Sequence, residues 1–334
     1  MTMIELTSVP QCPQCGSSHR RFMYNGVEHE YDNTTSQPFS FYRCVECTGV
    51  YLDPRPAENS LPVIYPHNYY SRAGGINTSP ASVNIKTAIG RILHNMNANR
   101  IARNLAPYVV LGSAHRLLDI GCGSGRHLGS IQLATSCMVE GIDFEMRDDL
   151  LDKYTVDPIT LHRGDIFAYD FKGKQYDVVY AAHIIEHIAD PVAFLRRISV
   201  LLKPGGICVL ETPNEDCLGA KIFGKYWGGN HIPRHWFLPN ARSHEILVKR
   251  AGDGLVLRRI SYIPITFSIW SFHALLQGLG MKKIADALFP SDHRYVSSSL
   301  INVGRHGVSY TLSLAEKILT GKSACMVTVV QKVV

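Results

Sequence analysis

The chain has 334 residues, of which 46% are hydrophobic and 19% are charged, so it can bury a core and fits one α/β domain with smaller attached units. Its formal net charge of +6 is mild and comes from scattered basic residues, which makes a nucleic-acid partner unlikely on charge alone. The sequence shows neither a signal-peptide pattern nor an apolar run of about 20 residues, so we expect a cytoplasmic protein without a membrane span.

Two C-x2-C pairs stand near the start of the chain, Cys12 with Cys15 and Cys44 with Cys47. Four thiolates at this spacing favour a closed tetrahedral Zn²⁺ site with a structural role. The metal would stabilise a segment that has few aliphatic side chains of its own. A reduced thiol cluster without metal, or a redox pair, remains an alternative. We predict a zinc ribbon over residues 1–56.

Residues 57–110 are predicted to form a linker and a helical cap. The segment opens with prolines and with aromatic residues that include Tyr70, and apolar residues recur at helical spacing over residues 84–105.

The run Leu117-Leu118-Asp119-Ile120-Gly121-Cys122-Gly123-Ser124-Gly125 comes next. It predicts an apolar strand with an acid near its end, followed by a turn in which every second residue is glycine. Such a strand-turn-helix presents a nucleotide-like ligand at the carboxyl edge of an α/β sheet. Arg126 occupies the position of the last glycine of a dinucleotide loop, which argues against a pyrophosphate ligand. Asp119 would repel phosphates but attract an ammonium group. A ligand that carries an amino acid and an adenosine fits this turn better.

Further strands are expected after this turn, and several of them lead to acids. Residues 138–143 end in Asp143, at the usual position for binding two ribose hydroxyls. Asp165 follows a short strand over residues 159–162, and strands over residues 176–180 and 207–211 complete the series.

Histidines form two groups around this edge. His183 and His187 belong to an H-x-x-E-H run directly after the fourth strand, and His231 and His235 lie in an insertion at about residues 213–240. The H-x-x-E-H pattern is also that of inverted zinc peptidases, but here it follows a strand rather than lying on a helix. Histidine is the natural general base at neutral pH. His235 and His187 are therefore the candidate catalytic residues, with a simple packing role for His235 as the alternative.

The late part of the chain is predicted to contain a helix over residues 241–251, a strand over 255–263 and a last strand over 324–332. A second insertion, at about residues 265–321, should hold one apolar helix over 270–288 and another over 308–319. Packing against the sheet or a partner subunit is the expected role of the apolar helix, with a lid or a membrane-facing surface as the alternative, and the sequence leaves a homodimer open.

The glycine run resembles motif I of class I S-adenosylmethionine (SAM)-dependent methyltransferases, and the later strands and acids match that family in order. The resemblance implies an α/β, Rossmann-like sheet of seven strands within residues 111–334, with the final strand antiparallel between its neighbours. It implies that Asp165 accepts a hydrogen bond from the adenine amino group and that Glu186 and His187 shape the cofactor pocket. The cofactor-binding residues expected from it are Asp119, Gly121, Cys122, Gly123, Gly125, Asp143, Phe144, Asp165, Ile166, His183 and Tyr70.

The ribbon and the aromatic residues after it resemble zinc-ribbon methyltransferases of sugar and natural-product pathways. In that group a Glu-His-Phe run corresponds to Arg234-His235-Trp236, and its histidine is a proposed acid-base group. Arg234 replaces the glutamate, which puts the same C-methylation in doubt and would suit an anionic acceptor. We expect His231, Arg234 and Trp236 to bind substrate. No catechol-type set of two acids and an asparagine stands near the fourth and fifth strands, so we expect no catalytic magnesium.

The resemblance favours methyl transfer to a small molecule, a sugar or a secondary-metabolite intermediate. Two alternatives remain. One is an RNA methyltransferase that reads its substrate with the ribbon, and the other is a catalytically silent protein that uses the fold for binding.

Overall fold

The computed structural model describes residues 3–69, 101, 105–123, 125, 128–156, 158–289 and 300–333. The expected helix over residues 84–105 therefore falls almost entirely outside the described residues, as does Tyr70. Within the described ranges, no helix combines the length and the apolar character needed to cross a bilayer.

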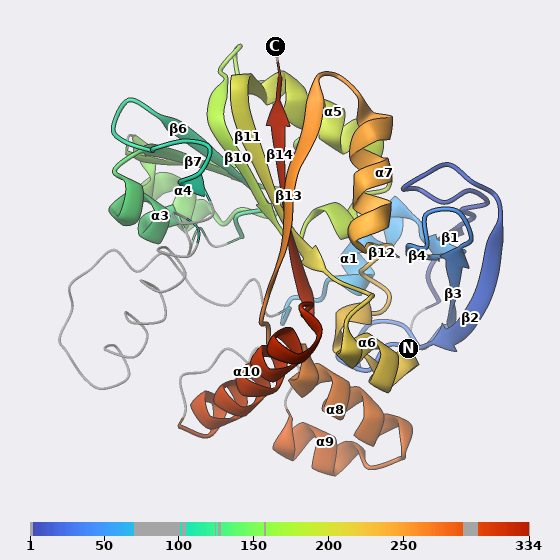
Figure 1. Ribbon diagram of the computed structural model, residues 1–334. Coiled ribbons are helices and arrows are strands. Elements are labelled where there is room, and N and C mark those ends of the chain that lie inside the picture. Colours follow the sequence, from blue (N-terminus) through green and yellow to red (C-terminus); the bar gives the residue numbers. More distant parts are fainter. Residues whose placement is uncertain are drawn as a thin grey trace.

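A twisted mixed sheet forms the centre of the molecule (Figure 1). Its strand order is β13-β14-β11-β10-β6-β7-β9-β8, in which β8 is a two-residue edge strand beside seven main strands. The strands are β6 (Arg116–Ile120), β7 (Met138–Asp143), β8 (Thr155–Val156), β9 (Ile159–Arg163), β10 (Tyr176–Ala182), β11 (Leu202–Pro213), β13 (Leu255–Ile263) and β14 (Cys325–Lys332). β14 runs antiparallel to both of its neighbours. This confirms the predicted sheet of seven main strands and the antiparallel final strand between its neighbours.

Helices cover both faces of this sheet, because its central strands are apolar on both sides. On one face lie α5 (Pro191–Leu201) and α7 (Ala241–Ala251), and on the other lie α3 (Leu128–Thr135) and α4 (Asp148–Lys153). The start of α5 is fixed by Asp190, which accepts hydrogen bonds from two backbone N–H groups, and that of α7 by a capping box between Asn240 and Ser243. The local caps explain why the sequence predicted the bounds of α7 correctly.

The amino-terminal segment forms a smaller sheet beside α7, seen in blue in Figure 1. Its order is β12-β4-β3-β2, and a separate pair, β1 (Leu6–Thr7) and β5 (Arg55–Pro56), is followed by a 3₁₀ turn, η1 (Glu58–Ser60), and α1 (Leu61–Ile64). The strands of the smaller sheet are β2 (Arg20–Gly26), β3 (Phe39–Cys44), β4 (Val50–Leu52) and β12 (Phe237–Leu238). β12 comes from the 213–240 insertion and pairs with β4. The insertion therefore completes the sheet of the amino-terminal segment.

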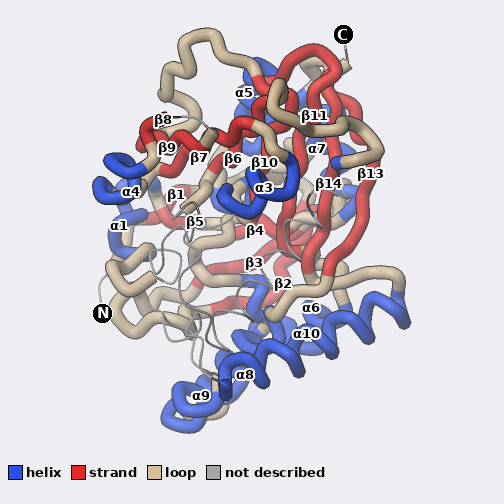
Figure 2. Tube along the Cα trace, turned by 90° about the vertical axis from the view of Figure 1, so that its left-hand side faces the viewer, coloured by secondary structure: helices blue, strands red, loops and turns tan. Residues whose placement is uncertain are grey.

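The carboxyl ends of the parallel strands face a helical layer, which lies below the sheet in Figure 1 and along the lower edge in Figure 2. This part contains η3 (Ile185–His187), α6 (Leu218–Phe223), η4 (Gly224–Tyr226), η5 (Gly228–Asn230), α8 (Phe267–Gly278), α9 (Lys282–Leu288) and α10 (Leu300–Thr320).

The prediction of one helix over residues 270–288 was wrong, since α8 ends at Gly278 and α9 begins at Lys282. Gly280 adopts a φ of +77 between them, a left-handed conformation that interrupts a helix. The second predicted helix of this region is longer than expected, because α10 already begins at Leu300.

Candidate active site

The glycine turn after β6 depends on backbone conformations that side chains rarely adopt. Gly121, Gly123 and Gly125 have φ values of +71, +55 and +70, which glycine reaches without steric cost. A Cβ at Gly121 would lie 1.9 Å from Cδ1 of Ile184. Gly121 thus lets the turn approach the segment after β10, and Gly123 donates its N–H to Asp143 Oδ2 at 2.8 Å.

Carboxylates gather where β6, β7 and β11 end. Burial, together with the charges of Asp143 and Glu211, raises the pKa of Asp119 well above its usual range. Asp143 accepts a second backbone hydrogen bond, from Glu145 at 2.9 Å, so its position is fixed from both sides. A positively charged ligand would relieve the repulsion among these acids, and the ammonium and sulfonium groups of SAM carry such charge.

The other residues predicted to bind cofactor border this edge in different ways. Asp165 is exposed and accepts a hydrogen bond from the N–H of Phe167 at 3.0 Å. Phe144 presents 70% of its surface to solvent directly after Asp143, whereas Cys122 and Ile166 are buried. The structure brings these residues to one end of the sheet, and their contacts with a cofactor stay a prediction.

The segment after β10 leaves the sheet through a strained residue. His183 has a φ of +56, and its N–H donates to Glu211 O at 2.7 Å. Its Nδ1 lies 3.3 Å from Glu186 Oε1. Although burial opposes the charge, hydrogen bonds with Cys325 and Glu186 raise the pKa of His183 well above its usual range. Non-glycine residues in this conformation concentrate at functional sites.

The two predicted catalytic histidines lie side by side, with ring centres 4.7 Å apart. Nδ1 of His187 lies 2.8 Å from the hydroxyl of Tyr65 and 2.9 Å from Arg234 O. Nδ1 of His235 lies 2.7 Å from Gly229 O. Burial is the main cause that lowers the pKa of His187 to about 4 and that of His235 well below its usual range. Both rings are therefore neutral at physiological pH.

Arg234 does not bind an acceptor in this arrangement, which corrects the prediction. Its side chain is completely buried and forms an ion pair with Glu28. Nε donates to Ile64 O at 2.8 Å and Nη1 to Ile232 O at 3.2 Å. Since these partners belong to the protein itself, the guanidinium stabilises the insertion and does not favour an anionic acceptor.

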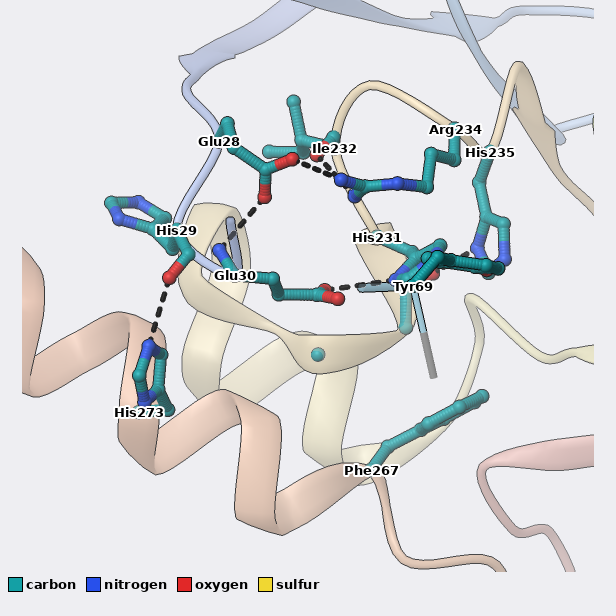
Figure 3. Close-up of polar contacts among 12 residues, drawn as sticks. Glu28, His29, Glu30, Tyr69, His231, Ile232, Arg234, His235, Phe267 and His273 are labelled. Atoms are coloured by element: carbon teal, nitrogen blue, oxygen red, sulfur yellow. Dashed lines mark hydrogen bonds and ion pairs between the residues drawn. The ribbon is translucent and has the colours of Figure 1, made fainter. Parts of the chain in front are cut away.

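A second carboxylate of the amino-terminal segment, that of Glu30, lies near Glu28, as Figure 3 shows. Glu30 Oε1 lies 2.9 Å from Nδ1 of His231, and the hydroxyl of Tyr69 lies 2.9 Å from Nε2 of the same ring. Both ring nitrogens of His231 therefore have partners. Sequence reasoning missed Glu28 and Glu30, because each lies about 200 residues from its partner and no local pattern marks it.

Trp236 is a buried residue of the insertion that packs against β5 of the amino-terminal segment. Its ring lies 4.1 Å from the Arg55 guanidinium carbon, and its backbone N–H donates to Glu186 O at 2.8 Å. This last bond ties the insertion to η3. A role of Trp236 in substrate binding stays a prediction.

The four cysteines of the amino-terminal segment converge as predicted. Their sulfurs all lie within 4.8 Å of one another, and the closest contacts are 3.5 Å for Cys12 with Cys47 and 3.4 Å for Cys15 with Cys44. A hydrogen bond from Cys47 lowers the pKa of Cys12 to about 6, and the same pairing raises the pKa of Cys47. The thiols cannot all ionise together without a cation, and the donor set fits tetrahedral Zn²⁺.

Two hollows formed by described residues lie away from the histidines. One of about 340 Å³ is lined by the Arg43–Glu215 ion pair and by Asn240 and Lys322. The other, of about 250 Å³, lies between α8 and α10. Their walls lack the acids and histidines described above, so we locate the candidate site from its chemistry, at the carboxyl edge of the sheet.

Comparison with known proteins identifies the central domain. Residues 90–253 match the family model of a methyltransferase domain. A ubiquinone biosynthesis O-methyltransferase of Cereibacter sphaeroides is 29% identical over 170 residues, which cover 48% of this chain and 68% of that protein.

The chain is also similar to a tRNA-modifying enzyme and to a solved methyltransferase structure. A tRNA U34 carboxymethyltransferase of Idiomarina loihiensis is 29% identical over 161 residues, covering 45% of this chain and 49% of that enzyme. Among solved structures, a putative sarcosine dimethylglycine methyltransferase from Galdieria sulphuraria shares 17% identity at a TM-score of 0.47, covering 71% of this chain and 84% of that one.

Proposed function

We propose that this chain, in which residues 90–253 match a methyltransferase domain, is a SAM-dependent methyltransferase that methylates an oxygen or an acidic carbon of a small molecule, such as a sugar or a secondary-metabolite intermediate. One observation carries the proposal. Ile184 touches the glycine turn, and Glu186, two residues later, is bonded through its backbone to the insertion that holds His235. The predicted cofactor turn and the paired histidines are thus neighbours.

We propose that the acids at the strand ends bind SAM. Asp119 would hold the ammonium group, and its buried carboxylate would regain its charge in that contact. Asp143 would accept hydrogen bonds from the ribose hydroxyls, since each of its oxygens keeps a lone pair beyond the backbone bond described above. Asp165 would accept from the adenine amino group.

When bound, SAM would supply a sulfonium methyl group: the acceptor atom would bond to the methyl carbon in line with the C–S bond, which breaks and leaves its electron pair on sulfur. Orientation and exclusion of water provide most of the acceleration of such a step. An O–H or C–H acceptor must also lose its proton. We propose that His235 and His187 activate that group, since their rings lie next to each other and His187 belongs to the segment that contacts the cofactor turn.

We also propose that Cys12, Cys15, Cys44 and Cys47 bind one structural Zn²⁺. The support is the spacing of their sulfurs and the repulsion that four thiolates would otherwise suffer. Because β12 pairs with β4, this metal would stabilise the insertion as well as the ribbon.

An RNA acceptor is the second candidate, and the similarity to a tRNA U34 carboxymethyltransferase supports it. The two candidates differ in their response to salt. Binding of RNA would weaken steeply as salt rises, because counterions are released from phosphates. A small uncharged acceptor would show little such dependence.

Turnover of methyl-labelled SAM with metabolite fractions and with tRNA would identify the acceptor class. We expect label in the metabolite fraction, and label in the tRNA would replace the first proposal by the second. His235→Ala should lower turnover at least tenfold and leave SAM affinity unchanged. His244→Ala is the matched control, since His244 is a buried histidine on α7 that bonds Thr328. Equal turnover of both variants would remove His235 from the site.

A further inference from the structure

Three side chains beside the predicted cofactor turn converge on one point. One ligand atom each from Glu186, His187 and His235 lie within 4.8 Å of one another. Glu186 and His187 belong to η3, and His235 belongs to the insertion. Ligand atoms around a single ion are about 3 to 4 Å apart at bond lengths of about 2.0 to 2.2 Å. Small side-chain rotations would therefore bring all three into contact with one cation.

Hydrogen bonds orient both imidazoles for such a role. In each ring Nδ1 faces a backbone carbonyl, Arg234 O for His187 and Gly229 O for His235. A ring that donates from Nδ1 presents the lone pair of Nε2, and metal-binding histidines are held in this way by groups behind them. Neither Nε2 makes a hydrogen bond within the described part of the chain, and that of His235 lies 3.9 Å from Glu186 Oε1.

Glu186 supplies an independent indication. Its side chain is completely buried, and its Oε2 has no hydrogen-bond partner among the described residues. An unsatisfied buried carboxylate oxygen costs about 1 to 3 kcal/mol or more. Its other oxygen, Oε1, lies 3.3 Å from Nδ1 of His183, so Oε2 is the carboxylate oxygen left to bind an ion.

We propose that Glu186, His187 and His235 bind a divalent transition-metal ion such as Zn²⁺, Mn²⁺ or Fe²⁺. Two imidazoles disfavour Mg²⁺, which prefers oxygen ligands, and three protein ligands leave positions open. The inference deepens the proposed function and rests on it for the role of the ion. With His187 and His235 acting as ligands, an acceptor oxygen in an open position would release its proton to water more readily, because the ion stabilises the resulting anion.

Binding of Mn²⁺ tests the site directly, because Mn²⁺ has little affinity for a four-cysteine site. The full chain is first supplied with one equivalent of Zn²⁺ for the ribbon, and Mn²⁺ is then titrated while the electron paramagnetic resonance signal of the free ion is followed. We expect one bound Mn²⁺ per chain. Glu186→Gln and His235→Gln should each weaken binding at least tenfold. His244→Gln should bind as the unchanged chain does.

Thermal unfolding of each variant shows whether the fold is intact, and calorimetric titration of SAM into the unchanged chain separates the two proposals. Saturable Mn²⁺ binding that only the site variants weaken, with the melting temperature kept, supports the metal site. Absence of saturable binding in the unchanged chain, or equal binding by Glu186→Gln, overturns it while methyl transfer stands. Conversely, if the unchanged chain binds Mn²⁺ but has no affinity for SAM, the proposed metal site stands and the proposed function is refuted.

Discussion

The close approach of Gly121 to Ile184 allows a quantitative test of the cofactor turn. In Gly121→Ala the new Cβ would lie 1.9 Å from Cδ1 and 2.4 Å from Cγ1 of Ile184, far inside van der Waals contact. The left-handed φ of +71 adds about 1 to 2 kcal/mol. The turn must shift, and we expect the dissociation constant for SAM to rise at least tenfold, which corresponds to about 1.4 kcal/mol.

Gly173→Ala is the matched control, because Gly173 has the same φ of +71 and no described atom lies within 4 Å of the point that its new Cβ would occupy. It should lose only the conformational term, about 1 to 2 kcal/mol of unfolding free energy, and keep its SAM affinity. The double variant Gly121→Ala with Ile184→Ala removes both clashing atoms and leaves Cβ of residue 184 at 3.7 Å, an ordinary contact.

Calorimetric titration of SAM and urea unfolding provide the two readouts. We expect the double variant to bind SAM more tightly than Gly121→Ala alone. If Gly121→Ala binds SAM like the unchanged chain, or if Ile184→Ala gives no recovery, the assignment of this turn to the cofactor is refuted.

Three further predictions concern charge and metal. Although burial opposes the charge, hydrogen bonds from His162 and Lys174 lower the pKa of Glu140 to about 2. The contribution of Glu140 to stability is therefore present above the usual pKa of 4.5 and is lost as pH falls toward about 2. In urea unfolding, Glu140→Gln should lower the unfolding free energy by up to about 3 kcal/mol at pH 7 and by progressively less in acid. SAM affinity should weaken as pH falls through the raised pKa of Asp119, because the cationic ligand favours the ionised carboxyl, and Asp119→Asn should bind less tightly with a flatter pH profile in calorimetry. Cys15→Ser should lower the zinc content measured by atomic emission and reduce the melting temperature by several degrees, and an unchanged zinc content would exclude this ligand set.

The sequence predicted the parts of the fold that depend on local chemistry. The glycine turn, the acids at the strand ends and the bounds of α7 each follow from neighbouring residues, so their positions agree with the structure. The four cysteines were also predictable, because the spacing within each pair is itself local.

What the sequence could not predict depends on contacts between distant segments. Arg234 resembles an anion-binding residue when read in its own context, and only the fold brings Glu28 to its guanidinium. The break between α8 and α9 depends on the left-handed Gly280, in a stretch where glycine is compatible with either a turn or a weak helix. The domain boundary at residue 56 stays a prediction.

The pairing of β12 with β4 limits how this protein can be shortened or recombined. A version that starts after residue 56 would leave Phe237 and Leu238 with an unpaired edge, one residue after the Trp236 N–H that bonds Glu186. It would also remove Glu28, which forms the ion pair with Arg234, and Glu30, which bonds Nδ1 of His231. The amino-terminal module and the late insertion should therefore be exchanged between homologous enzymes only as a matched pair.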